Sequence, residues 1–173
     1  MLLNVDRLSV EIATPRGALR AVQEVSFAVE KGETLCIVGE SGCGKSVTAL
    51  SLLGLLPRAA TRTAAQMTFD GRDMLAMSKA ETRALRGDRL SMIFQEPMTA
   101  LNPLHTIGRQ LTDVYRAHRS ASKEAARVRA ADLLERVGIS NARARLSQYP
   151  HELSGGMRQR VVIAMALMCE PEL

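Results

Sequence analysis

One run of eight residues constrains this chain more than any other: Gly39-Glu40-Ser41-Gly42-Cys43-Gly44-Lys45-Ser46. It fits the spacing G-x-x-x-x-G-K-[ST], in which small, flexible residues let consecutive backbone N–H groups point inward at an anion. A helix that begins at Lys45 would add the positive end of its dipole. The run therefore predicts a site for the triphosphate of a nucleotide, ATP with Mg²⁺. In it Lys45 reaches the β- and γ-phosphates and the Ser46 hydroxyl binds the metal.

The residues on either side of this run supply the context that the motif requires. Residues 35–38 are continuously apolar, which predicts a strand buried on both faces of a parallel sheet. Residues 45–55 read as a helix that Pro57 ends. The alternative is a chance glycine-rich turn, but a buried strand before the loop and a helix after it favour the phosphate site.

The rest of the chain mixes strand and helix patterns. Strands are expected at residues 2–12, 22–29, 67–69 and 90–94, with turns at 31–33 and at Asp70-Gly71. Ser78 and Glu81 fit a capping box, so a helix should run to about Arg86 and end at Gly87. Helical patterns continue from Ile107, with an apolar face and a stop at Gly138, and again from near Ser154 through Ala166. Together these patterns predict an α/β domain with a helical subdomain.

Composition excludes several classes of protein. The net charge is +5, but the 23 basic residues are mixed with 18 acidic ones, and only 3% of residues are aromatic, so we expect a solvated surface and no nucleic-acid partner. Three cysteines without a C-x-x-C pair indicate a reduced protein with no disulfide and no thiolate metal site. Asp6 and Arg7 come too early for a signal peptide, and the longest apolar run, residues 161–169, is too short to span a bilayer.

Two further motifs carry weaker signals by themselves. Gln95 follows the strand expected at 90–94, where its amide would ligate the metal or orient water, although a glutamine at a strand end is more often an ordinary surface residue. Residues 153–159 place Ser154, Gly155 and Gly156 at a helix start, which suits a second anion site. Taken alone, that stretch is better explained as an N-cap with a flexible lead-in.

Taken in order, the glycine-rich loop, the Gln-ended strand and the stretch LSGGMRQR resemble the nucleotide-binding subunit of an ABC transporter. Residues 93–104, IFQEPMTALNPL, and Tyr149-Pro150-His151-Glu152 are similar to the importer ATPases for dipeptides, oligopeptides and nickel. The resemblance covers residues 2–173 and implies a P-loop NTPase with an antiparallel β portion. It divides the chain into a β portion with the P-loop core at 1–95, a helical subdomain at 96–153 and a signature helix at 154–173.

The resemblance also implies partners and roles. Two cassettes, identical or homologous, would stack head to tail, so that residues 39–46 of one and the other's Ser154, Gly155, Gly156 and Gln159 sandwich each ATP. Lys45 and Gln95 would be catalytic, and Ser46 and Gln95 would bind Mg²⁺. The cassettes would sit peripherally on the cytoplasmic face of the inner or plasma membrane. There they would drive integral membrane permease subunits and, indirectly, an extracytoplasmic solute-binding protein.

The sequence departs from this family in two places. It ends at Leu173, where the family continues into a strand carrying a metal-binding Asp and a water-activating Glu, with a switch His later. The chain is therefore expected to be truncated at its carboxyl end and inactive alone, with no general base assigned. The loop after the first strand offers Arg16 in place of an aromatic residue to stack on the base. The alternatives are a catalytically inactive remnant and a soluble ABC ATPase with no transport role.

Overall fold

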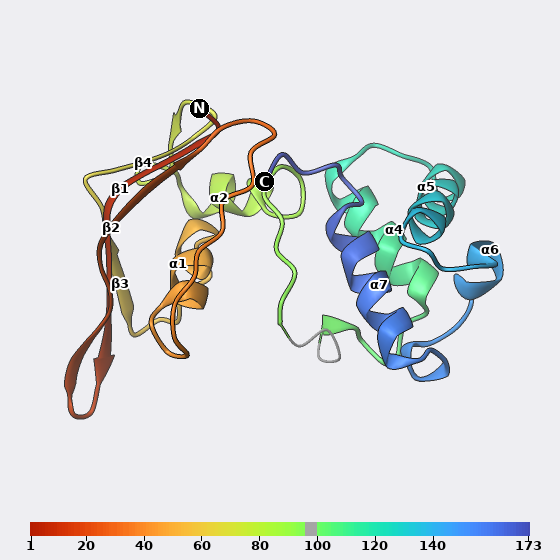
Figure 1. Cartoon of the computed structure of the whole chain (residues 1–173). Coiled ribbons are helices and arrows are strands. Elements are labelled where there is room, and N and C mark those ends of the chain that lie inside the picture. Colours follow the sequence, from red (N-terminus) through yellow and green to blue (C-terminus); the bar gives the residue numbers. More distant parts are fainter. Residues whose placement is uncertain (96–99) are drawn as a thin grey trace. The chain divides into compact units, whose positions relative to one another are not determined.

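The computed structural model describes residues 1–95 and 100–173, and the chain forms two compact units, Met1–Arg83 and Ala84–Leu173 (Figure 1). The division that the sequence suggests, at residues 95/96 and 153/154, stays a prediction. Residues 96–99, which belong to the stretch IFQEPMTALNPL, lie outside the described residues.

The first unit is built on an antiparallel sheet with the order β2-β1-β4-β5. Strand β1 forms a hairpin with β2 on one side, while β3 and β4 pair with consecutive stretches of its other edge and β5 pairs with β4. The strand bounds are β1 Leu3–Thr14, β2 Gly17–Val29, β3 Ala60–Thr63, β4 Gln66–Phe69 and β5 Arg72–Asp73. The strands expected at 2–12, 22–29 and 67–69 are confirmed, and β3 and β5 are short additions that the pattern did not reveal.

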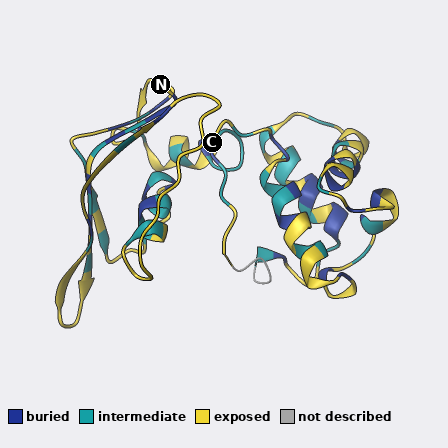
Figure 2. Ribbon diagram, viewed as in Figure 1, coloured by how far each residue is buried: buried dark blue, intermediate teal, exposed yellow. Residues whose placement is uncertain are grey.

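The core of this unit lies on one face of the sheet. The buried residues of β1 alternate on each side of an irregularity between Val5 and Leu8, and β4 adds two more buried side chains. The buried residues of the two strands are Leu3, Val5, Leu8, Val10, Met67 and Phe69. Helix α1, Lys45–Leu52, lies beside the sheet and contacts β1 and β2 (Figures 1 and 2). The helix ends three residues before the expected Leu55, because Gly54 takes a positive φ of 62° that stops it.

The second unit is helical, and its helices from residue 107 onward pack around one apolar cluster. Helix α2, Lys79–Leu85, begins in the first unit; the others are α4 Ile107–His118, α5 Lys123–Arg136, α6 Ala142–Arg145 and α7 Gly155–Ala166, with a 3₁₀ turn at Pro150–Glu152. The predicted stops at Gly87 and Gly138 are confirmed by positive φ angles of 79° and 80°. The predicted start near Ser154 is confirmed as well, since its side chain accepts a hydrogen bond from the Met157 N–H. None of the described helices combines the length and the apolar character that crossing a bilayer requires.

Two predicted strands are wrong. The strands expected at 35–38 and 90–94 do not form, since Leu90 makes only an isolated bridge with Arg86 and the other residues have no strand structure. Val38 is 88% exposed and Phe94 is 46% exposed. An apolar run becomes a buried strand only where neighbouring strands complete its hydrogen bonds, and none of the described strands pairs with either run. Residues 89–91 do pair in parallel with the end of the chain: the Ser91 N–H donates to the Leu173 carbonyl over 2.8 Å, and the Leu173 N–H donates to the Arg89 carbonyl over 3.2 Å.

Candidate nucleotide-binding site

The phosphate loop, residues 39–46, turns sharply into helix α1 at Gly44. This residue has φ 96° and ψ 0°, a left-handed backbone conformation that residues with a Cβ atom rarely adopt. A Cβ atom here would overlap the Ala21 carbonyl oxygen and lie 3.2 Å from Cγ2 of Val22, so the backbone of β2 lies directly against the loop. Only glycine meets both demands.

Helix α1 presents bare amides at its start. Gly44 is the N-cap and makes no side-chain hydrogen bond, and the first turn holds no acidic residue. The amides of the first turn have no intrahelical partner, and the first intrahelical bond found runs from the Thr48 N–H to the Gly44 carbonyl over 2.8 Å. Free amides together with the positive end of the helix dipole favour an anion at this position.

The Lys45 ammonium lies across the loop. It donates to the carbonyls of Gly39 and Glu40, each over 2.7 Å, and lies 3.5 Å from the Cys43 sulfur. An ammonium has three N–H donors, and a thiol is a weak acceptor. The donor that faces Cys43 is therefore the one that a phosphate oxygen can take without breaking the two carbonyl contacts.

The site has a hydroxyl but no metal cage. Ser46 is exposed at the second position of α1. Among residues 1–95 and 100–173 no group of three His, Cys, Asp or Glu side chains could hold a metal ion. A hydroxyl such as that of Ser46 suits Mg²⁺, which is commonly bound through one or two side chains together with substrate phosphates and water.

The other predicted site residues are exposed, and their functional roles stay predictions. Arg16 lies in the turn between β1 and β2, where its N–H donates to the Thr14 hydroxyl over 3.2 Å. Gln95 ends the described part of the irregular segment after Leu90. The predicted site residues are divided between the two units. Residues 39–46 lie together in the first unit, and the second unit contains Gln95 and residues 154–159.

The start of α7 has the features of an anion site and of an ordinary cap at once. The Ser154 hydroxyl accepts from the Met157 N–H over 3.3 Å, which satisfies one amide of the first turn. A Cβ atom added at Gly155 or Gly156 would meet nothing within 4 Å, so both glycines face open space. Gln159 is exposed on the next turn. The geometry leaves the N–H groups of the two glycines accessible to a ligand.

Three arginines that sequence reasoning missed hold α7 in place. Arg160 donates to the Val137 and Gly138 carbonyls, each over 2.9 Å, at the end of α5. Arg129 donates to the Met168 carbonyl over 3.4 Å, and Arg119 donates to the Cys169 carbonyl over 3.2 Å. Basic side chains favour the negative ends of helices. Their positions in sequence gave no sign of this role, because each partner lies more than 20 residues away.

Comparison with known proteins gives one consistent result. Residues 22–173 match the family described as ABC transporter. "Dipeptide transport ATP-binding protein DppD" of Bacillus subtilis (strain 168) is 51% identical over 173 residues, covering 99% of this chain and 52% of that protein. "Oligopeptide transport ATP-binding protein OppD" of Escherichia coli (strain K12) is 49% identical over 172 residues, covering 99% of this chain and 51% of that protein. The chain thus spans about half the length of the curated relatives it matches.

Solved structures agree on the fold. The chain is similar to a structure described as "Dimeric structure of a post-hydrolysis state of the ATP-binding cassette MJ0796 bound to ADP and Pi", with a TM-score of 0.85 and 24% identity. The match covers 98% of this chain and 71% of that one. At this identity the likeness shows the fold, an α/β P-loop NTPase with an antiparallel sheet and a set of helices.

Proposed function

The chain belongs to the ABC transporter family, and from that premise we propose that it binds ATP with Mg²⁺ on residues 39–46 as an energising subunit of a peptide-type importer. The observation that carries the proposal is the turn at Gly44, which joins uncapped helix amides to the Lys45 ammonium in one loop. Backbone amides and a lysine in this arrangement suit the β- and γ-phosphates of a nucleotide.

Each residue of the loop has a separate task in this proposal. The amides at the start of α1 bind phosphate oxygens, and Lys45 places one charge beside them while it keeps its two carbonyl contacts. The Ser46 hydroxyl holds Mg²⁺, which when bound offsets the negative charge on the phosphates. Gln95 is assigned as a second ligand of the metal or as the residue that orients water, and Arg16 as the group that stacks on the base.

The transport role and the partners rest on the relatives. Several relatives about half identical to this chain are described as dipeptide or oligopeptide transport ATP-binding proteins. We propose a similar solute class here. Two cassettes would close on ATP, with Ser154, Gly155, Gly156 and Gln159 of one completing the phosphate loop of the other. Peripheral association with permease subunits on the cytoplasmic side of the membrane, and an indirect link to a solute-binding protein, complete the proposal.

Binding and turnover are separate claims. ATP hydrolysis is the activity of the family. None of the residues assigned within 1–173 is a general base, so we propose that a polypeptide of these residues binds ATP and hydrolyses it slowly by itself. Hydrolysis by this polypeptide at a rate comparable to that of a full-length cassette would refute this part of the proposal.

The test of nucleotide binding is a titration with Mg²⁺-ATP. We expect the chain to bind, and Lys45→Met to weaken binding by about a hundredfold, because a charge-assisted contact to phosphate is lost along with two contacts that shape the loop. Lys79→Met is the matched control, since Lys79 is an exposed lysine at the start of α2 in the same unit. Equal affinities for the two variants would reject the loop as the binding site.

A further inference from the structure

A line of hydrogen bonds follows the buried face of α1 from the phosphate loop to the far end of the helix. The Gly44 carbonyl accepts from the Thr48 hydroxyl over 3.1 Å, and the Thr48 carbonyl accepts from the Ser51 hydroxyl over 2.7 Å. The Ser51 carbonyl accepts from Nη1 of Arg62 over 2.5 Å. Thr48 is 5% exposed and Ser51 is fully buried, so water has little access to these two side chains, whereas Arg62 is half-buried.

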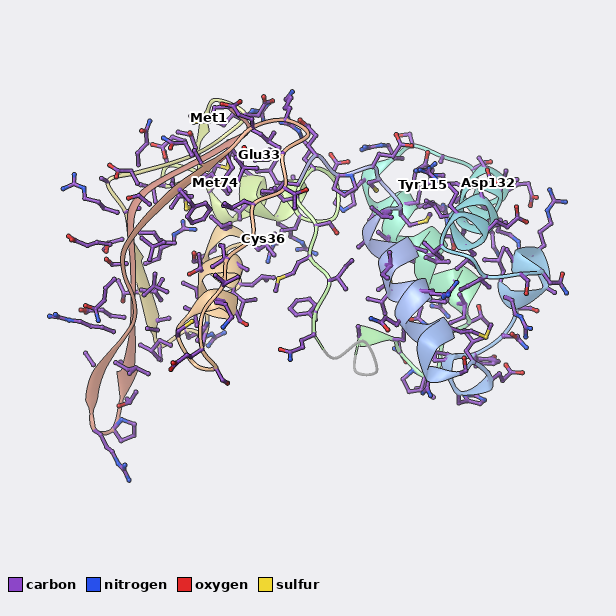
Figure 3. All side chains as sticks on the ribbon, viewed as in Figure 1. Met1, Glu33, Cys36, Met74, Tyr115 and Asp132 are labelled. Carbon is purple, nitrogen blue, oxygen red and sulfur yellow. The ribbon has the colours of Figure 1, made fainter. Side chains whose placement is uncertain are left out.

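Arg62 approaches the helix from another element. It lies on β3, opposite Val10 of β1. Its other terminal nitrogen, Nη2, lies 3.5 Å from the carbonyl of Met74, a residue labelled in Figure 3. Burial lowers the pKa of the guanidinium. The groups that face it are backbone carbonyls, and the Ser51 carbonyl belongs to the last turn of α1, where the helix dipole is negative.

We propose that Arg62 is a positioning residue for the phosphate loop. It fixes the carboxyl end of α1 to the sheet, and the bonds of Thr48 and Ser51 carry that constraint back to Gly44. The eight-residue helix is short and begins at Lys45, so a shift at Ser51 moves the amides that face the phosphates. The inference rests on the proposed binding of ATP at residues 39–46.

The substitutions follow from the contacts. Arg62→Met keeps the length of the side chain and removes every donor, so we expect the Kd for Mg²⁺-ATP to rise about tenfold. Arg62→Lys keeps the charge but cannot reach two diverging carbonyls, so we expect a rise of about threefold. Thr48→Val keeps the shape and removes the hydroxyl bond to the Gly44 carbonyl, while the backbone N–H bond to the same carbonyl stays. It tests the same line of bonds should Arg62→Met fail to fold, with an expected rise of about threefold.

Two measurements on the full chain separate positioning from mere stability. Leu3→Ala is the control, because Leu3 is buried in the same unit at the end of β1 that pairs with β4 rather than β3. Hydrogen exchange without nucleotide should show faster exchange of the α1 amides in Arg62→Met than in Leu3→Ala. Kd values, taken well below both melting transitions, should rise only in the Arg62 and Thr48 variants.

The outcomes are distinct. Unchanged exchange in α1, or equal Kd values for Arg62→Met and Leu3→Ala, overturns the inference while leaving the proposed function intact. A wild-type chain that binds no Mg²⁺-ATP overturns the proposed function, and with it the role of Arg62 in binding. Faster exchange in α1 with a raised Kd, partly restored in Arg62→Lys, supports the inference.

Discussion

Replacing Gly44 by alanine tests the geometry of the phosphate loop most directly. The residue has φ 96°, and a left-handed conformation costs an L-residue about 1–2 kcal/mol. Its new Cβ atom would also overlap the Ala21 carbonyl oxygen, so β2 or the loop must shift. Overpacking of this kind costs about 1–3 kcal/mol. If the sum, about 3 kcal/mol, falls on the binding-competent loop, the Kd for Mg²⁺-ATP rises on the order of a hundredfold.

Two neighbouring glycines provide internal controls. Gly42 has φ 83° and open space around its Cβ position, so Gly42→Ala bears the backbone cost alone, about tenfold in Kd. Gly39 lies outside the left-handed region, and its Cβ would meet the Cys43 side chain, whose sulfur at 2.7 Å can turn away. Gly39→Ala should therefore have the smallest effect.

The assay is a titration of each variant with a fluorescent ATP analogue and Mg²⁺, alongside thermal melts of the same samples. The expected order of Kd values is Gly44→Ala, then Gly42→Ala, then Gly39→Ala, with the wild type lowest. If Gly44→Ala binds as tightly as Gly42→Ala, the contact between the loop and β2 does not constrain the site, and the steric argument fails.

Four other predictions concern the rest of the chain. Hydrogen bonds from Ser78 hold the pKa of Glu81 below its ordinary value. The capping box therefore stabilises the folded chain at pH values above the unfolded pKa, and this contribution is lost as the pH falls through the lower folded pKa. Glu81→Gln should have a lower Tm than the wild type at neutral pH, and the difference in Tm should close in acid. A thiol reagent should label Cys36 and Cys43 quickly and Cys169 only after denaturation, because Cys169 is buried and burial raises the pKa of its thiol. Rapid labelling of all three cysteines would contradict the packing at the end of α7. Arg160→Met should lower the free energy of unfolding of the helical unit by about 1 kcal/mol in denaturant titrations, since two carbonyls at the end of α5 lose their donor. Arg143 is exposed, so Arg143→Met is the control. An equal loss in both variants would show that the bonds of Arg160 to these carbonyls contribute nothing. The polypeptide of residues 1–173 should show a broad melting transition by calorimetry, because the apolar side chains of Leu35, Ile37 and Val38 are exposed next to the loop. A sharp two-state transition would contradict this prediction.

Features set by neighbouring residues were predictable from the sequence. The capping box of Ser78 and Glu81, the stops at Gly87 and Gly138 and the N-cap at Ser154 each depend on a few consecutive residues, and the structure has all of them. The phosphate loop belongs to the same class, because its turn and its helix start are encoded within residues 39–46.

Features set by distant residues were not predictable. Residues 35–38 have the composition of a buried strand, but a strand also needs partners, and none of the described strands pairs with them. Arg62 is separated from Ser51 by 11 residues, and Arg119 from Cys169 by 50, so nothing local marks either as a cap for a helix end. The periodicity of a sequence carries no information on such contacts.

The glycines of the loop join these two classes. A pattern treats Gly39, Gly42 and Gly44 as equal members of one motif, yet the structure gives each a different constraint. Gly42 is constrained by its own backbone angle, a local matter, while Gly44 is constrained by the Ala21 carbonyl of β2 as well. The motif therefore encodes the shape of the phosphate loop, and the sheet decides how firmly that shape is held. Binding at this loop should accordingly respond to substitutions on β2 and β3 that never touch the nucleotide.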